Sequence, residues 1–282
     1  MTSNTDLPAI GTVNTTEIAG LSIRYAVGGA SEGLPLLLTS PWPESVYAFH
    51  RVLPGLASKH PLLVVDLPGY GLSQSRPEVM APEAMGGFVI SLLQHFRIAR
   101  THVVAPDVGT PAVLFAAAKQ ESFFESLVVG GAAMRVDLAA GQLKDLLHTP
   151  PGALANLDGA EALKDYFTAA ARLTPESIIA DFRKASAGRR LEDATQFVRG
   201  YIPDLPKLER LLPKIKTPVL IVAGKSDPIV PPPNGQLLAD HLPHNRYVLL
   251  DAGHRIWEEA TAEYVAAMRR WFDADYRTYG MS

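Results

Sequence analysis

The stretch HVVAPDVGTP, residues 102–111, decides the fold. Its first half is a short apolar run, which predicts a buried strand. An apolar helical pattern, AVLFAAAK, follows at residues 112–119. Asp107 lies at the turn between the two elements. A carboxylate is costly to remove from water, so its place at the end of a buried strand calls for a chemical reason.

Five other apolar runs resemble the one before Asp107: LPLLLTS, HPLLVVD, ESLVVGG, TPVLIVAG and NRYVLLD. Their apolar residues are consecutive rather than alternating, which is typical of strands buried on both faces of a parallel sheet. Two further short strands are predicted around a turn at Gly20. Helical patterns separate the runs and cover Ser45–Ala57, Pro82–Phe96, Pro111–Lys119 and Glu258–Asp273. This alternation predicts an α/β fold with a mostly parallel, doubly wound sheet.

One long segment interrupts the alternation. Residues 134–211 contain no strand pattern and read as several short helices separated by Pro and Gly. We therefore predict a core domain formed by residues 1–133 and 212–282, with residues 134–211 inserted as a helical domain.

Composition limits the classes of function. The chain has 282 residues, 47% of them apolar and 20% charged, with a net charge of −3, which is ordinary for a globular protein. Nucleic acid is an unexpected partner at that charge. The absence of cysteine excludes disulfides, thiolate nucleophiles and cysteine metal sites. No signal peptide and no membrane-spanning run is evident, so we expect a cytoplasmic protein that does not bind membranes.

Polar residues follow several of the predicted strands. Asp107 comes first in the chain, then Asp227 after VLIVAGKS, and then His254 after VLLDAG. Ligand sites of open α/β sheets lie beyond the carboxyl ends of the strands, so these three side chains are expected at one edge. Nucleophile, acid and histidine in this order is the arrangement of the α/β-hydrolase catalytic triad.

The turn at Asp107 departs from the usual pattern of that triad. The strand–nucleophile–helix turn normally reads G-x-S-x-G, whereas here it reads Ala-Pro-Asp-Val-Gly at residues 105–109. An aspartate in the nucleophile position can displace a leaving group from a saturated carbon and form an alkyl–enzyme ester. His254 would then activate water against the ester, and Asp227 would hold the imidazole in the productive tautomer.

Five motifs in order resemble the Asp-nucleophile branch of the α/β-hydrolase superfamily, which comprises epoxide hydrolases and haloalkane dehalogenases. They are SPWPES at 40–45, DLPGYGLSQ at 66–74, APDVGTPA at 105–112, AGKSDPIV at 223–230 and DAGHRIWEEA at 251–260. The resemblance covers nearly the whole chain and implies that residues 134–211 are a cap domain. It implies that the N–H groups of Trp42 and Val108 form the oxyanion hole and that the Trp42–Pro43 bond is cis. Ser40-Pro41 stands where the family has His-Gly.

The resemblance also narrows the reaction. Haloalkane dehalogenases of this kind usually have Trp directly after the nucleophile, and haloacetate dehalogenases have arginines there, but this chain has Val108 followed by Gly109 and Thr110. An epoxide hydrolase is therefore favoured, acting without cofactor or metal. In that family two cap tyrosines protonate the ring oxygen, and the candidates here are Tyr166 and Tyr201.

Three alternatives stay open at this stage. The reaction could be hydrolysis of a carbon–halogen bond instead of an epoxide. The protein could also bind a small molecule and keep the fold without turnover. Tyr166 and Tyr201 could also be plain packing residues of the cap. The expected partner is a small organic substrate of low to moderate polarity, and a homodimer is left open.

Overall fold

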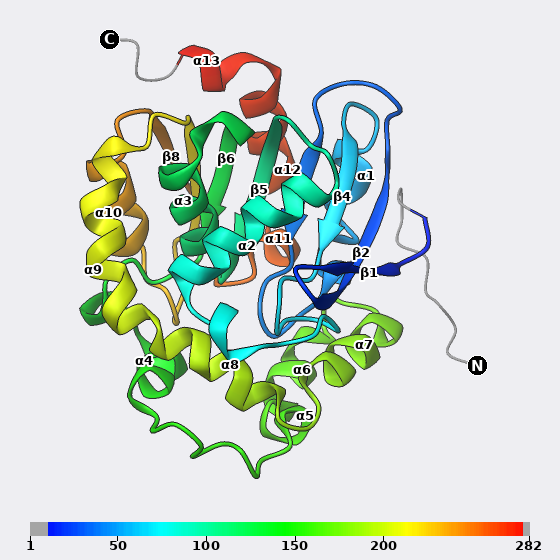
Figure 1. Cartoon of the computed structure of the whole chain (residues 1–282), viewed down its shortest axis with the longest axis vertical. Helices are drawn as coiled ribbons and strands as arrows, with labels where there is room; N and C mark the ends of the chain where they lie inside the picture. Colours follow the sequence, from blue (N-terminus) through cyan, green and yellow to red (C-terminus); the bar gives the residue numbers. More distant parts are fainter. Residues whose placement is uncertain (1–10, 279–282) are drawn as a thin grey trace.

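The computed structural model describes residues 11–278, so the outermost parts of the predicted core domain, 1–10 and 279–282, lie outside it. Its centre is an eight-stranded sheet in the order β1-β2-β4-β3-β5-β6-β7-β8 (Figure 1). From β4 onward all neighbours are parallel, and only the β1–β2 and β2–β4 pairs are antiparallel. The strands are β1 (Asn14–Ile18), β2 (Leu21–Gly29), β3 (Leu36–Thr39), β4 (Pro61–Val65), β5 (Thr101–Pro106), β6 (Phe124–Gly130), β7 (Val219–Gly224) and β8 (Asn245–Leu250). The predicted α/β class and its mostly parallel sheet are confirmed.

Two apolar layers cover the two faces of the sheet. One contains residues of α2 (Pro82–His95), α3 (Gly109–Lys119), α9 (Tyr201–Leu211) and α10 (Pro233–His241). The other contains residues of η1 (Val46–Phe49), α1 (Leu53–Leu56), α11 (Ile256–Glu259) and α12 (Thr261–Arg270). Side chains of β5 alternate between them, Val103 facing the first layer and Val104 the second. Helices on both faces explain why the parallel strands are apolar throughout.

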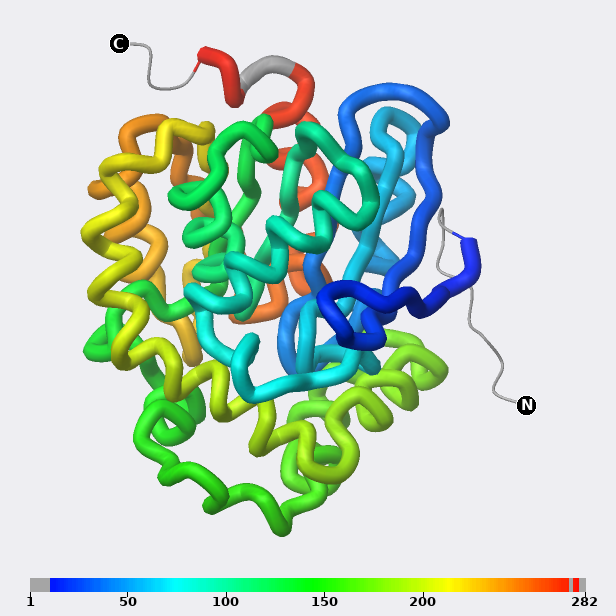
Figure 2. The backbone as a smooth tube through the Cα atoms, in the orientation of Figure 1, coloured from blue at the N-terminus to red at the C-terminus, as the bar shows by residue number. Residues whose placement is uncertain are grey.

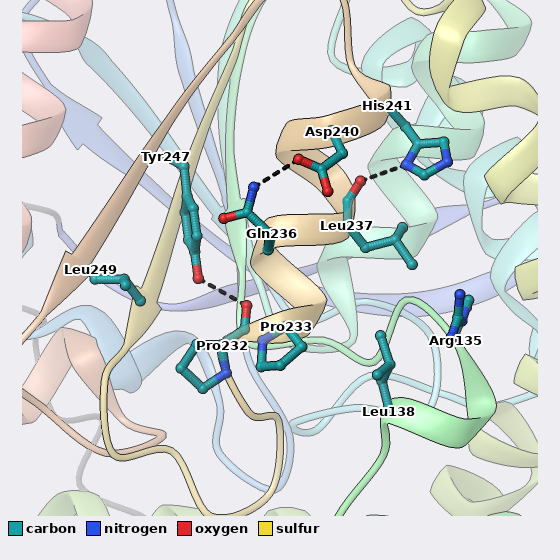
Figure 3. Close-up of a pocket in the computed structure, with 10 residues that line it drawn as sticks. All are labelled: Arg135, Leu138, Pro232, Pro233, Gln236, Leu237, Asp240, His241, Tyr247 and Leu249. Atoms are coloured by element: carbon teal, nitrogen blue, oxygen red, sulfur yellow. Dashed lines mark hydrogen bonds between the residues drawn. The ribbon is translucent and has the colours of Figure 1, made fainter.

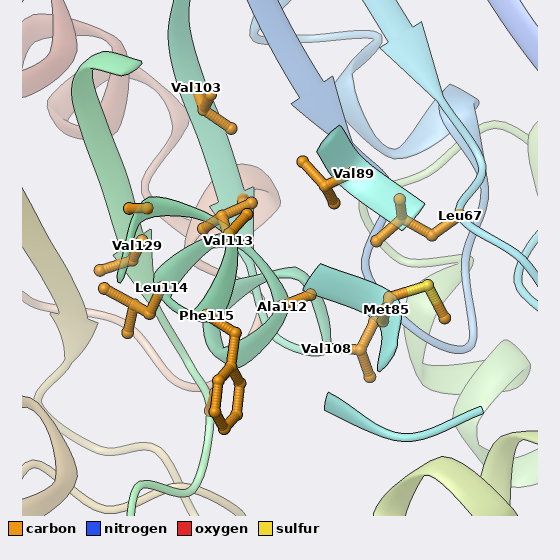
Figure 4. Packing of buried hydrophobic residues seen from close by; sticks show 14 of the residues in the cluster. Leu67, Met85, Val89, Val103, Val108, Ala112, Val113, Leu114, Phe115 and Val129 are labelled. Atoms are coloured by element: carbon orange, nitrogen blue, oxygen red, sulfur yellow. The ribbon is translucent and has the colours of Figure 1, made fainter. Parts of the chain in front are cut away.

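Packing around the start of α3 fixes the turn that carries Asp107. Val108, the first residue after Asp107, is only 3% exposed and belongs to the same apolar cluster as Met85 of α2 (Figure 4). A Cβ atom added to Gly109 would lie 2.3 Å from Thr39 Oγ1 of β3, so the start of α3 lies against that strand. Only glycine allows so close an approach. The turn is therefore held by the packing of the two residues that follow Asp107.

Two predicted helices are broken in the structure. Ser45–Ala57 becomes the 3₁₀ helix η1 and the separate α1, because Pro54 near the start of α1 has no N–H to continue a hydrogen-bond ladder from the preceding turn. The predicted Glu258–Asp273 helix begins earlier, at Ile256, and is interrupted at Ala260 between α11 and α12.

The segment predicted as a cap contains only helices and turns among its described elements. After the short η4 (Val136–Leu138) come α4 (Gly141–His148), α5 (Gly159–Ala162), α6 (Lys164–Ala170), α7 (Glu176–Ser186), α8 (Arg190–Arg199) and α9. Outside this segment, the connections contain the 3₁₀ helices η2 (Pro77–Val79), η3 (Glu121–Phe123) and η5 (Leu212–Lys214). A π-helical turn (Trp271–Asp275) and α13 (Tyr276–Thr278) follow α12. Helices α4–α8 lie beyond one end of the sheet, and α9 runs back along the core (Figure 2). Two hydrogen bonds from Arg24 of β2 to Asp181 of α7, 2.8 and 3.1 Å long, tie the segment to the core.

Within residues 11–278, no helix is long and apolar enough to cross a membrane.

Candidate active site

Asp107 occupies a strained turn between β5 and α3. Its φ is +53°, in the left-handed region, which aspartate tolerates better than most residues. Its backbone N–H donates to Gly130 O at the end of β6, 2.8 Å away. The Thr110 hydroxyl bridges β5 and β6 by lying 2.8 Å from Ala105 O and 3.0 Å from Gly130 O. These hydrogen bonds fix the backbone at Asp107, so that the residue stands at the carboxyl end of the sheet.

Backbone N–H groups surround the Asp107 carboxylate. Trp42 N donates to Asp107 Oδ2 over 2.7 Å, and the Val108 N–H is close enough to lower the pKa of the same carboxylate. Burial raises the pKa of Asp107 to about 6, although the charge of His254 and these two N–H groups lower it. The structure therefore places the N–H of Trp42, one of the two predicted oxyanion-hole donors, on Asp107 itself.

The loop that carries Trp42 is anchored by a buried carboxylate. Ser40 Oγ donates to Asp66 Oδ1 over 2.7 Å, and Val46 N donates to the same oxygen over 2.7 Å. Asp66 also accepts from Leu72 N at 3.0 Å, so it joins this loop to the turn after β4. Ser40, which stands where the family has His, therefore holds the Trp42 loop by its hydroxyl. The Trp42–Pro43 bond is cis, as predicted.

His254 and Asp227 form a hydrogen-bonded pair. His254 Nδ1 lies 2.7 Å from Asp227 Oδ2, and because a carboxylate only accepts, Nδ1 carries the proton and Nε2 is left as a base. The other oxygen of Asp227 accepts from Ile229 N and Val230 N, both at 2.8 Å. Burial lowers the pKa of His254, but the hydrogen bond and charge of Asp227 outweigh it, so the pKa is raised overall.

The imidazole of His254 faces the turn of Asp107. A Cβ atom added to Gly131 would lie 3.7 Å from Asp107 N and 3.8 Å from His254 Cε1, so both groups border the same small space. Asp107, Asp227 and His254 are thus brought together from the ends of three different strands.

Tyr166 of α6 lies in a buried polar cluster with Glu44. Its hydroxyl donates to Glu44 Oε1 over 2.5 Å, and Arg255 Nε donates to the same oxygen over 2.6 Å. Trp257 Nε1 donates to the other oxygen over 2.8 Å. Neither Glu44 nor Arg255 was predicted from the sequence to have a role. Their signals were present, since Glu44 follows the Trp42–Pro43 pair and Arg255 follows His254.

Tyr201, the other predicted proton donor, begins α9 and is 2% exposed. Within the described part of the chain its hydroxyl has no hydrogen-bond partner, unlike that of Tyr166. Burial and the charge of Asp107 raise the pKa of Tyr201 well above 10. The phenol is therefore protonated at neutral pH and free to donate.

A surface hollow of about 420 Å³ lies away from this site (Figure 3). Proline, leucine and polar side chains of the η4 segment, α10 and β8 line it, and Tyr247 Oη donates to Pro232 O there over 2.9 Å. None of its lining residues is a predicted site residue. A second hollow, of about 410 Å³, lies beside Tyr166 and Arg255.

Comparison with known proteins identifies the family of this chain. The family model described as "alpha/beta hydrolase fold" matches residues 35–261. The chain belongs to this family. Hydrolysis is the chemistry that membership supports, while the substrate has to be argued from the site.

Relatives differ in what their names say they act on. The uncharacterized hydrolase YugF of Bacillus subtilis is 23% identical over 90% of this chain and 95% of its own. The solved structure of the epoxide hydrolase CorEH has a TM-score of 0.79 at 20% identity, covering 93% of this chain and 98% of that one. The enol-lactonase of Burkholderia xenovorans LB400 has a TM-score of 0.77 at 20% identity, covering 92% and 100%. These likenesses show the fold.

Proposed function

We propose that this protein is a hydrolase in which Asp107 is the nucleophile and forms an alkyl–enzyme ester, with an epoxide as substrate and a vicinal diol as product. The supporting observation is the hydrogen bond from Trp42 N to Asp107 Oδ2. In a serine enzyme, an oxyanion hole binds an oxygen of the substrate. Here the N–H groups hold an oxygen of the enzyme, which becomes the carbonyl oxygen of the ester when the other carboxylate oxygen attacks.

The two steps balance with the residues present. Asp107 Oδ1 bonds to an epoxide carbon while the ring C–O bond breaks, and the ring oxygen takes the electron pair and a proton from a phenol. Water then loses a proton to His254 Nε2 and adds to the ester carbonyl carbon. The oxyanion that forms on Oδ2 is stabilised by the N–H groups of Trp42 and Val108. On collapse the bond between Oδ1 and the carbonyl carbon breaks, and the imidazolium of His254 gives its proton to the departing diol oxygen. The carboxylic acid left on Asp107 then loses its proton to solvent, which restores the carboxylate.

Two features favour an epoxide over an alkyl halide. Val108, next to the nucleophile, has no side-chain donor for a departing halide. Tyr201 provides a protonated, unpaired phenol, and the charge of Asp107 acts on it. An alkoxide leaving group needs such a proton, whereas a halide does not. Tyr166 remains the second candidate acid, although its proton is already shared with Glu44.

A trapping experiment tests the proposal. His254→Gln removes the base of the second step and leaves Asp107 able to attack, so the ester should accumulate. The variant is incubated with a panel of terminal and aryl epoxides and, in parallel, with bromoalkanes, and the Asp107 peptide is analysed by mass spectrometry. Added epoxide mass on Asp107 is expected, and His254→Gln/Asp107→Asn is the control that should carry none. Labelling by bromoalkanes alone would replace the epoxide assignment with dehalogenation, and labelling by neither would overturn the nucleophile.

A further inference from the structure

Tyr70 lies in the turn after β4, within the sequence PGYG at residues 68–71, and the sequence analysis gave it no role. Its side chain is 1% exposed. Gly69 and Gly71 on either side have positive φ values of 81° and 51°. A Cβ atom on Gly71 would lie 1.9 Å from the Asp66 carboxylate, so the turn is fixed against the residue that also anchors the Trp42 loop.

The ring of Tyr70 is part of an aromatic row that ends at Tyr201. It packs edge-on against Phe197 of α8, with the ring centres 5.7 Å apart, and Phe197 packs against Tyr201 at 5.6 Å. One tyrosine thus comes from the core and the other from the predicted cap. Both tyrosine rings therefore pack against Phe197.

The hydroxyl of Tyr70 is buried and has no hydrogen-bond partner among the residues that the structure describes. Buried polar groups are almost always paired, and an unpaired one costs stability, so each exception needs an explanation. A phenylalanine would fill the same space without that cost. A bound ligand with an oxygen that accepts the hydrogen bond of the Tyr70 hydroxyl would explain why a tyrosine stands here.

The electrostatic surroundings of Tyr70 point to the same region. Burial raises the pKa of Tyr70 well above 10, and Tyr201 and the charge of Asp107 raise it further. Asp107 also acts on Tyr201 in this way. Both phenols are therefore protonated donors within electrostatic range of the nucleophile.

We infer that Tyr70 and Tyr201 together form the donor pair for the oxygen that leaves the carbon attacked by Asp107. The inference rests on the proposed function. As the epoxide C–O bond breaks, its electron pair passes to the ring oxygen. One phenol transfers its proton to that oxygen and the other keeps it in place by a hydrogen bond; the tyrosinate regains a proton from water before the next turnover. Tyr166 then serves to hold Glu44 and Arg255.

The test measures ester formation, not turnover. Tyr70→Phe, Tyr201→Phe and the double variant are made in the His254→Gln background, so that the ester persists, and its rate of appearance is followed by quenched-flow mass spectrometry with an epoxide that labels the parent. Tyr264→Phe, which removes the hydroxyl of a buried tyrosine in the opposite layer, is the matched control. Thermal unfolding of each variant is measured without ligand.

We expect Tyr70→Phe to form the ester at least roughly tenfold more slowly, as for loss of a general-acid contact, while Tyr264→Phe matches the parent. The double variant should lose less than the product of the two single losses, because both hydroxyls act on one oxygen. The melting temperature of Tyr70→Phe should be unchanged or higher.

Three results would overturn the inference. If no epoxide labels Asp107 in the parent, the proposed function fails and the inference with it. If the parent is labelled and Tyr70→Phe is labelled as fast, only the inference fails. If Tyr70→Phe is slower but melts at a lower temperature than the parent, the hydroxyl supports the free protein and its assigned role is wrong.

Discussion

Asp107 Oδ2 accepts the backbone N–H of Trp42 at 2.7 Å, which joins the turn after β5 to the loop after β3. In the proposed mechanism this contact gives the two carboxylate oxygens different tasks. Oδ2 is held by the Trp42 N–H, and Oδ1 would attack the substrate. The proposal thereby gives a chemical reason for a largely buried carboxylate at the end of a strand.

Replacing Asp107 with Asn should abolish turnover and stabilise the fold at neutral pH. The amide is nearly isosteric but is a poor nucleophile. The raised pKa of about 6 means that the ionised form is disfavoured in the folded state. A shift from an ordinary value near 4 corresponds to at most about 3 kcal/mol, and because the side chain keeps some solvent contact we expect a gain of about 1–2 kcal/mol at pH 8. Asn also suits the left-handed backbone.

Denaturant unfolding of both proteins from pH 8 to pH 4 checks this prediction. The wild-type carboxylate becomes protonated as the pH falls through about 6, so the advantage of Asp107→Asn should shrink below that pH and vanish near pH 4. Equal stability at pH 8, or substantial activity in a variant shown to be free of deamidation, would contradict the assignment.

The two chemical steps should fail at different pH values. Ester formation needs ionised Asp107, so its rate should fall as the pH drops through about 6. Ester hydrolysis needs neutral His254, whose pKa is raised above its ordinary value by Asp227. As the pH falls, this step should therefore begin to slow before ester formation does. Wild-type protein quenched during turnover near pH 6.5 should therefore carry more ester than at pH 8. An ester level that does not change with pH would argue against His254 as the base.

The two predicted cap acids should differ in importance. Tyr201→Phe should slow ester formation from an epoxide at least roughly tenfold, since its hydroxyl has no other acceptor. Tyr166→Phe should have the smaller effect, because its proton is already bonded to Glu44. Bromoalkanes, whose leaving group needs no proton, should label both variants at the parent rate. Unchanged epoxide rates in both variants and in their double variant would make these tyrosines packing residues.

Ser40→Ala should weaken the proposed oxyanion hole indirectly, by loosening the loop that carries Trp42. The substitution removes the 2.7 Å bond to Asp66 and leaves that buried carboxylate with two backbone donors and Arg24, 3.6 Å away. We expect a loss of about 1.5–3 kcal/mol in the free energy of unfolding, typical of a hydrogen bond to a charged group. The rate of ester hydrolysis should fall severalfold, and Ser91→Ala on α2 is the control. Normal stability and hydrolysis would show that Ser40 does not position Trp42.

Sequence reasoning located the strand-end residues because the carboxyl ends of parallel strands share one edge of a sheet. Asp107, Asp227 and His254 each follow an apolar run, and their order predicted a hydrolase triad. Tyr70 could not be found in this way, since what singles it out is the lack of a partner in three dimensions. Glu44 and Arg255 stand beside predicted site residues in the sequence. Their contacts with Tyr166 of α6 and Trp257 of α11, however, depend on elements far apart in the chain, and no local pattern reveals them. The helix predicted at Ser45–Ala57 was wrong in detail, because Pro54 divides it.

The central claim is that Asp107 becomes covalently bonded to the substrate and that water attacks the resulting ester. It is tested most directly by a single turnover in ¹⁸O-labelled water, with wild-type enzyme in excess over an epoxide that it hydrolyses. The oxygen that Asp107 gives to the diol is unlabelled, and the water oxygen stays in its carboxylate. The account predicts ¹⁸O in the Asp107 peptide and none in the first diol formed. Label in the diol, with none in the peptide, would mean that water attacks the substrate directly and would contradict the account.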